Sequence, residues 1–439
     1  MALCVPVISP SWGTAGAGLR EQLLPKELRA SEQKKKKKTC KAGRRGEGRE
    51  GVLGFRLVCE ASQEEEQERS RGASAAIWQQ PPAEIVKILG QKVWGRKLPP
   101  GALVAVVREV WSSGWHTMMA QLAPSDEQKG FKRLDSQFRS RPITPAQSGR
   151  YHLYAAFTCP WAHRCAIVHV LKGLEDAVPL SIAVPGSTGL WEFKPQKFLD
   201  KPKGTLTPTA DRATGKRRLV DVYQSQVGGY NGRSTVPMFW DSMENRVVNN
   251  ESADIIEILN ADFNHLARNP GLDLAPPHLK ADIDRWNQII YSNVNNGVYR
   301  CGFAQGQSAY NSAVESLFET LDMLDQHLTT SRYLCGDSLT LADIRLFTTL
   351  FRFDPVYQIL FKCTKQKLAE YHSLDGYMRD IYQVPGVAST CDLPAIMDGY
   401  YKVLFPLNPG GICPTVPRYS DSSALLRPHN RQSMLVNIV

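Results

Sequence analysis

The chain has 439 residues, of which 42% are hydrophobic and 22% charged. These are ordinary globular values, so they exclude collagen-like, fibrous and wholly disordered proteins. The formal net charge is +10, but residues 1–59 carry most of that excess, with 13 Lys/Arg against 5 Asp/Glu. The rest of the chain is nearly neutral, which argues against a basic groove for nucleic acid.

Residues 1–75 lack sustained hydrophobic periodicity and contain a run of five lysines at 34–38. Because so few apolar groups cannot offset the entropy of ordering, we expect this tail to be disordered. Its composition, and the RLVCEAS stretch around Cys59, are typical of a cleaved chloroplast transit peptide. A nuclear address and an extension without a selected role are the competing interpretations.

Residues 76–150 are predicted to be a lead-in to the folded body. The apolar spacing at 102–122 predicts one amphipathic helix or a broken pair, and the polar residues 124–150 predict an extended connector.

A strand followed at once by a helix then places a cysteine at their junction. YHLYAAF (151–157) has strand character, and AHRCAIVHVLKGL (162–174) has helical spacing. Thr158 is a candidate N-cap, and Pro160 fits the first helical turn. Because free backbone N–H groups and the helix dipole stabilise an anion there, we predict that Cys159 is a nucleophilic thiolate. The alternative is a buried, inert cysteine.

The ten cysteines are too few for a disulfide scaffold and contain no CxxC pair. Position 162 is Ala, and Cys165 is expected to face elsewhere, so Cys159 would need a partner thiol from a small molecule. His163 and His169 are interpreted as surface or satisfied core groups. Since zinc-spaced ligands, phosphate-binding glycine patterns and apolar runs of 18 residues do not occur, we expect no metal and no membrane partner.

A second strand–helix pair follows at STVPMFWD (234–241) and RVVNNESADIIEILN (246–260). A cis bond before Pro237 would free the backbone of Val236 to pair with a peptide-like ligand. Glu251 and Ser252, a candidate N-cap, could together hold the charged end of a glutamyl group; the alternative for Ser252 is a plain capping serine.

The remaining pattern is helical, with an acidic variant of the capping box at Thr340 and Asp343. The predicted helices are 279–294, 311–329, 341–361 and 374–384. A Pro-rich segment (405–417) and a polar tail (418–439) end the chain.

These features together resemble the glutathione transferase superfamily. Within it, six segments resemble the glutathionyl-hydroquinone reductases, also called the xi class, over about residues 125–417: FTCPWAHR (157–164), TVPMFWD (235–241), NNESADII (249–256), NNGVYRCGFA (295–304), LADIRLFTTLFRFDPVY (341–357) and GYYKVLFPLNPGGICP (399–414). The resemblance implies an α+β chain, with a thioredoxin-like α/β domain at 151–265 and an all-α domain at 275–417. The N-terminal extension is like that of plastid members.

Site residues follow from the same resemblance, position by position. It implies that Cys159 is catalytic, that glutathione contacts Trp191, Val236, Glu251 and Ser252, and that the hydroquinone pocket contains Tyr299 and Tyr400, with Tyr401 as the rival of Tyr400. This chain departs from the family pattern at Cys301, at residues 195–233, at Gly399 and at 402–406.

The implied reaction is reductive deglutathionylation, with glutathione as co-substrate and a homodimer as the assembly. The Cys159 thiolate attacks the sulfur of a glutathionyl-hydroquinone, and a second glutathione resolves the resulting mixed disulfide. Two other hypotheses stand beside it. One is an omega-like glutathione thiol transferase or dehydroascorbate reductase, and the other is a non-catalytic protein that binds quinones or tetrapyrroles.

Overall fold

The computed structural model describes residues 100–186, 189–195 and 205–436. The predictions of a disordered tail and a transit peptide at 1–75 lie outside these residues. The described residues from Ser113 onward form one compact unit, and those before it belong to a second. The lead-in helix is confirmed as a single helix, α4 (Pro100–Leu122).

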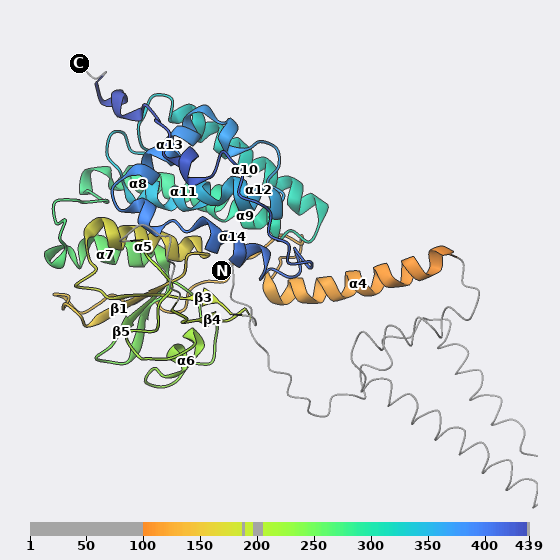
Figure 1. Ribbon diagram of the computed structural model, residues 1–439, viewed down its shortest axis with the longest axis horizontal. Helices are drawn as coiled ribbons and strands as arrows, with labels where there is room; N and C mark the ends of the chain where they lie inside the picture. The colour runs from red at the N-terminus through yellow and green to blue at the C-terminus, as the bar shows by residue number, and fades with distance from the viewer. Residues whose placement is uncertain (1–99, 187–188, 196–204, 437–439) are drawn as a thin grey trace, which may run out of the picture. The chain divides into compact units, whose positions relative to one another are not determined.

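A four-stranded sheet forms the centre of the first half of the compact unit. Its order is β2-β1-β5-β6, with β1 (Tyr151–Ala155) parallel to β2 (Leu180–Ile182), and β5 (Met238–Asp241) antiparallel to both β1 and β6 (Arg246–Asn249). Every residue of β1, β2 and β5 is buried, as expected for strands covered on both faces. In Figure 1, α5 (Pro160–Lys172) and α7 (Ser252–Ala261) lie between this sheet and the helices of the second half.

The second half is helical, as predicted. Its main helices are α8 (Lys280–Ile290), α9 (Gly297–Gly302), α10 (Gln307–His327), α11 (Leu341–Arg352), α13 (His372–Gln383) and α14 (Leu393–Tyr401). The capping box of Thr340 and Asp343 is confirmed at the start of α11. Among the described residues, no helix combines the length and apolar character needed to cross a bilayer.

Two of the predicted helices are interrupted. Residues 341–361 divide into α11, a π-helical turn (Phe353–Tyr357) and α12 (Gln358–Leu360), because Pro355 lacks the N–H that a continuous helix would use. A second π-helical turn, Tyr291–Asn295, ends the helix predicted at 279–294.

Short elements complete the described part of the chain: β3 (Val184–Pro185), β4 (Trp191–Glu192), α6 (Leu219–Gln224), α15 (Ser422–Leu425) and 3₁₀ turns at Asn264–Leu266, Pro277–Leu279, Leu368–Glu370, Val387–Thr390 and Arg431–Val436.

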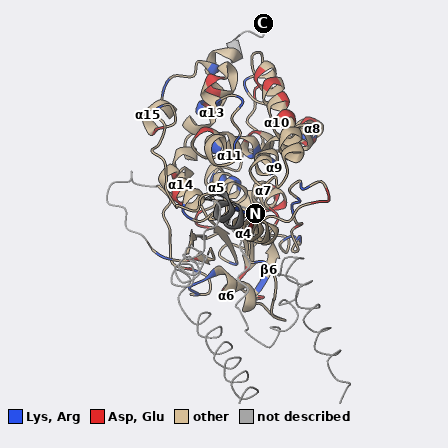
Figure 2. Cartoon of the chain, turned by 90° about the vertical axis from the view of Figure 1, so that its right-hand side faces the viewer, with Lys and Arg blue, Asp and Glu red and all other residues tan. Residues whose placement is uncertain are grey.

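The two halves meet where α5, which also packs against α7 in its own half, packs against α11 of the helical half. Figure 2 shows acidic residues along α10. The arginines Arg345 and Arg352 belong to α11. Both arginine side chains are buried against the first half. The interface between the halves therefore holds positive charge close to the N-termini of α5 and α7.

The extended connector predicted at 124–150 lies along the edge of the sheet. The Ser140 amide donates to the Val248 carbonyl, the Asn250 amide donates to the Phe138 carbonyl, and Arg139 forms an antiparallel bridge with Asn249. The connector therefore extends the sheet beyond β6 and passes beside the start of α7.

The segment predicted to be a polar tail also packs on the helical half. Arg431 is buried and donates hydrogen bonds to the carbonyls of Leu328, Ser331 and Arg332. Three neutral acceptors on one loop thus hold the last described residues against the end of α10.

Candidate active site

Cys159 lies in the tight turn that joins β1 to α5. Its amide donates to the Ala156 carbonyl at 3.3 Å, and its carbonyl accepts from the His163 amide at 2.9 Å. The Cys159 thiol is buried and donates to the Val236 carbonyl across a distance of 3.4 Å. The expected cis Val236–Pro237 bond is present. Two residues separated by 77 positions in the sequence are therefore brought into contact.

Both helix caps near the site differ from the predictions. Cys159, rather than Thr158, is the N-cap of α5, and no side chain satisfies the first amides of that helix. Glu251, rather than Ser252, is the N-cap of α7, because its carboxylate reaches the Ala253 amide at 3.1 Å. The uncapped amides leave the N-terminus of α5 suited to an anion such as a thiolate.

A cavity of about 330 Å³ opens beside this turn. Val236, Glu251 and Ser252, three of the residues that the resemblance assigns to glutathione, are among its walls. The sequence analysis missed several further walls, which come from the connector, from α5, from the loop before Val236 and from the turn between β6 and α7: Arg133, Ser136, Gln137, Trp161, Tyr230, Arg233, Thr235 and Asn250.

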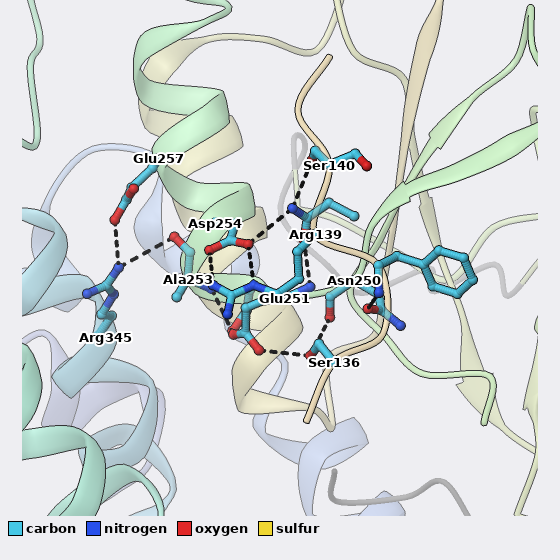
Figure 3. A network of polar contacts seen from close by, with 12 residues as sticks. Ser136, Arg139, Ser140, Asn250, Glu251, Ala253, Asp254, Glu257 and Arg345 are labelled. Atoms are coloured by element: carbon cyan, nitrogen blue, oxygen red, sulfur yellow. Dashed lines mark hydrogen bonds and ion pairs between the residues drawn. The ribbon is translucent and has the colours of Figure 1, made fainter. Parts of the chain in front are cut away.

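Two carboxylates line this cavity, those of Asp135 and Glu251, and Figure 3 shows the polar contacts of Glu251. The Glu251 carboxylate accepts hydrogen bonds from the Ala253 amide and from the Ser136 hydroxyl, the latter at 2.8 Å. Burial opposes its ionisation, but these two bonds and the charges of Arg133 and Arg164 outweigh burial, so the pKa of Glu251 lies below its usual value. Glu251 is therefore an anion at neutral pH and suits an ammonium group.

Two arginines stack on Trp161, and both Trp161 and one of these arginines, Arg133, line the cavity. The guanidinium carbon of Arg133 lies 3.9 Å from the centre of the Trp161 ring, and that of Arg164 lies 4.5 Å from it. One guanidinium nitrogen of Arg133 and the indole nitrogen of Trp161 are buried and have no hydrogen-bond partner among the described residues. Unpaired donors beside an anion suit a ligand that carries both carboxylate and ammonium groups.

Three buried tyrosines form a hydroxyl cluster on the helical side; we call Tyr299, Tyr357 and Tyr400 the tyrosine cluster. The hydroxyl oxygens of Tyr299 and Tyr400 are 2.6 Å apart, and those of Tyr357 and Tyr400 are 3.0 Å apart. Burial raises the pKa of each phenol above its usual value, so the hydroxyls stay protonated at neutral pH. They are therefore available as proton donors.

The structure places Tyr400, and not its rival Tyr401, in this cluster. The Tyr401 hydroxyl donates to the Pro355 carbonyl at 3.0 Å instead. Gly399 allows α14 to lie close to Thr158, the residue before Cys159, because an added Cβ at position 399 would lie only 2.3 Å from the Thr158 hydroxyl oxygen. Sequence reasoning missed Tyr357, although it lies within the quoted FRFDPVY segment.

The remaining predicted residues fall outside the cavity. Trp191 is a buried residue of β4 and is not among the cavity walls that the structure describes. Burial raises the pKa of the Cys165 thiol well above its usual value, which fits a structural role. His163 and His169 are buried and hydrogen-bonded, as the satisfied-core interpretation requires. Over the described ranges, no group of three His, Cys, Asp or Glu could hold a metal ion.

Comparison with known proteins identifies the family. Models of the glutathione S-transferase N-terminal and C-terminal domains match residues 158–262 and 307–379. The glutathionyl-hydroquinone reductase of Escherichia coli (strain K12) is 43% identical over 286 residues, which are 65% of this chain and 84% of that protein.

Solved structures agree with this assignment. The glutathione-bound structure of a glutathione transferase homologue from Escherichia coli K-12 is 42% identical, with a TM-score of 0.60 over 65% of this chain and 89% of that chain. The Xi glutathione transferase of Phanerochaete chrysosporium is 40% identical, with a TM-score of 0.62 over 67% and 95% of the two chains. The chain therefore belongs to the glutathionyl-hydroquinone reductases, the Xi-class glutathione transferases.

Proposed function

We propose that this chain removes glutathione from glutathionyl-hydroquinones through a mixed disulfide on Cys159. The observation that carries the proposal is the position of the Cys159 thiol, at the uncapped N-terminus of α5 and within hydrogen-bond distance of a wall of the cavity. A single thiol at such a position can act as a nucleophile and then accept a second thiol from solution. Family membership supports the choice of glutathione as that thiol.

The cavity matches glutathione in charge. The α-ammonium group of the γ-glutamyl end would bind the Glu251 carboxylate, and its α-carboxylate would accept from the Ser252 hydroxyl and from Arg133 or Arg233. The backbone of Val236 would pair with the cysteinyl residue of glutathione and so direct its sulfur towards Cys159. Trp191 is proposed to contact glutathione from β4, and a Trp191→Ala variant with an unchanged KM for glutathione would contradict that role.

The reaction then proceeds in two displacements. The Cys159 thiolate attacks the glutathionyl sulfur, an S–S bond forms, and the bond from that sulfur to the ring carbon breaks. The ring carbon takes the electron pair and a proton from the tyrosine cluster, which releases the hydroquinone. A second glutathione loses its thiol proton, which restores the tyrosine cluster. Its thiolate then attacks the glutathionyl sulfur of the mixed disulfide, which gives oxidised glutathione and returns Cys159 as the thiolate.

A direct assay separates this function from that of the omega-like alternative. Glutathionyl-menadiol and dehydroascorbate are offered to the full chain in parallel, each with excess glutathione. We expect menadiol to be released with stoichiometric formation of oxidised glutathione, at a kcat/KM well above that for dehydroascorbate. A preference for dehydroascorbate would support the omega-like alternative, and retention of the quinone without consumption of thiol would support a binding protein.

The pair of neighbouring tyrosines on α14 tests the proton donor. Tyr400→Phe removes the hydroxyl that bonds both other members of the cluster, so we expect kcat to fall about 100-fold, at the lower end of the range for a general acid. Tyr401→Phe is the matched control, since its hydroxyl bonds only the Pro355 carbonyl. It should keep kcat and lower the free energy of unfolding by about 1 kcal/mol. Equal kcat values in the two variants would contradict the assignment.

Two finer features are proposed from the resemblance and, for the second, from the composition of the N-terminal tail. The chain is proposed to be a homodimer, and light scattering of the eluted full chain that gives a monomer mass would refute this. Residues 1–75 are proposed to direct the chain to the chloroplast and to be removed there. A fusion of those residues to a fluorescent protein that stays outside plastids, or is not shortened, would refute the targeting role.

A further inference from the structure

Arg352 is the last residue of α11, and its buried side chain reaches the turn that carries Cys159. One terminal nitrogen, Nη2, donates to the carbonyl of Phe157, two residues before the cysteine. The other, Nη1, donates to the Thr348 carbonyl at 2.7 Å and lies 3.0 Å from Nδ1 of His163, four residues after the cysteine. One guanidinium from the helical half therefore holds this turn on both sides of the cysteine.

The charge of this guanidinium sets the direction of a buried hydrogen-bond chain. Arginine can only donate, so Nδ1 of His163 must accept and Nε2 must carry the ring proton. Nε2 then donates to the Thr390 hydroxyl at 2.9 Å, and that hydroxyl donates to the Val387 carbonyl at 2.7 Å. Burial and the charge of Arg352 hold the pKa of His163 well below its usual value. The histidine is thus neutral, and the positive charge stays on Arg352.

The other groups around Cys159 comprise neutral thiols, phenols and a histidine, one carboxylate and further arginines. The titratable and charged groups near this turn include His163, Arg164, Cys165, Glu251, Cys391, the tyrosine cluster and Arg133, which stacks on Trp161. Burial raises the pKa of both further thiols and of the phenols, which leaves them uncharged. Arg164 lies in the field of the Glu251 carboxylate, and Arg345, the other buried arginine of α11, pairs with Glu257 at 3.4 Å.

Neutral acceptors alone bind Arg352: the carbonyls of Phe157 and Thr348 and Nδ1 of His163. Across the described ranges, no carboxylate lies within ion-pair distance of its guanidinium, and its Nε has no hydrogen-bond partner. A buried cation without a counter-charge is costly, and an anion that forms nearby reduces that cost.

We propose that Arg352 is a positioning residue whose unpaired charge stabilises the Cys159 thiolate, both before it attacks and when the second glutathione releases it. The inference rests on the proposed function, since it takes Cys159 as the nucleophile. A fixed cation that is already in place when negative charge develops needs no reorganisation during the reaction. The hydrogen bond to the Phe157 carbonyl keeps that cation in register with the turn.

The test measures the reactivity of Cys159 itself and needs no hydroquinone. The full-length wild-type protein and three variants, Arg352→Gln, Arg352→Lys and Thr390→Val, are alkylated with iodoacetamide between pH 5 and pH 9. Peptide mass spectrometry then gives the rate at Cys159. For Arg352→Gln we expect the rate at pH 6.5 to fall about tenfold while the plateau at high pH is kept, because losing the charge moves the profile to higher pH. Arg352→Lys should retain the wild-type profile.

Thr390→Val is the matched control. It breaks the same hydrogen-bond chain in the same buried region but removes no charge, so its profile should not move. An unchanged profile in Arg352→Gln, or a loss of rate that is equal at every pH, overturns the proposal, because a merely structural role predicts the second result. If circular dichroism shows that Arg352→Gln is unfolded, Arg352→Lys decides: a profile displaced to higher pH despite the retained charge overturns it. A wild-type Cys159 that does not react at any pH would refute the proposed function instead.

Discussion

Replacing Cys159 by Ser should lower kcat at least about a thousandfold while glutathione still binds. A serine hydroxyl stays protonated at neutral pH and cannot form a mixed disulfide, so the first displacement is lost altogether. The cavity walls that would bind glutathione do not include Cys159, so the dissociation constant from calorimetry should remain within about threefold of wild type, well under the tenfold that 1.4 kcal/mol represents.

Cys165 provides the matched control for this variant. It lies on α5, the helix whose N-cap is Cys159, and it is also buried. Its thiol contacts the carbonyls of Trp161 and Ser252 and does not line the cavity. Cys165→Ser should keep kcat within about threefold, since it removes no reacting group. Turnover by Cys159→Ser at a tenth of the wild-type rate would mean that another thiol, or no thiol, performs the chemistry. Equal turnover numbers in Cys159→Ser and Cys165→Ser would mean the same.

Replacing Glu251 by Gln should raise the KM for glutathione about 10- to 100-fold with a smaller change in kcat. The glutamine retains an oxygen that can cap α7, but it loses the negative charge that would bind the ammonium group, and hydrogen bonds to charged groups are worth about 1.5–3 kcal/mol. Saturation kinetics with glutathione as the varied substrate measure the effect.

The pH dependence adds a second readout for this carboxylate. Because the pKa of Glu251 lies below its usual value, the carboxylate stays ionised as the pH falls through the range where an ordinary glutamate takes up a proton. The KM of the wild type for glutathione should therefore stay constant through that pH range and rise only at lower pH.

Asp254 supplies the control for Glu251. It lies in the first turn of the same helix and pairs with Arg139 on the outside of the cavity (Figure 3). Asp254→Asn should leave the KM for glutathione unchanged. A KM that rises equally in both variants would show that the first turn of α7, and not the Glu251 charge, determines the affinity.

The elements that the sequence could predict are those with a local signal. The strand–Cys–Pro–helix order around Cys159, the proline after Val236 and the capping box at Thr340 each depend on residues a few positions apart. The resemblance added Tyr299 and Tyr400, which the structure brings within hydrogen-bond distance of each other.

The residues that sequence reasoning missed act over long separations. Arg133 belongs to the connector, and its stacking on Trp161 depends on how that connector lies beside the sheet. Arg352 lies 195 positions from Phe157, and its position at the end of α11 resembles an ordinary basic helix terminus. The two wrongly predicted helix caps have a different cause. Helix α5 begins one residue later than a Thr158 cap requires, and α7 begins one residue earlier than a Ser252 cap requires, so the neighbours Cys159 and Glu251 are the N-caps.

One measurement tests the central claim most directly, namely that Cys159 carries glutathione during turnover. The full chain is mixed with one equivalent of glutathionyl-menadiol and no free glutathione, then quenched in acid and analysed by intact and peptide mass spectrometry. We expect one glutathionyl group per chain, located on the peptide that contains Cys159, together with an equal amount of released menadiol, and the group should disappear when glutathione is added. Menadiol released without that adduct, or an adduct on another cysteine, would contradict the account.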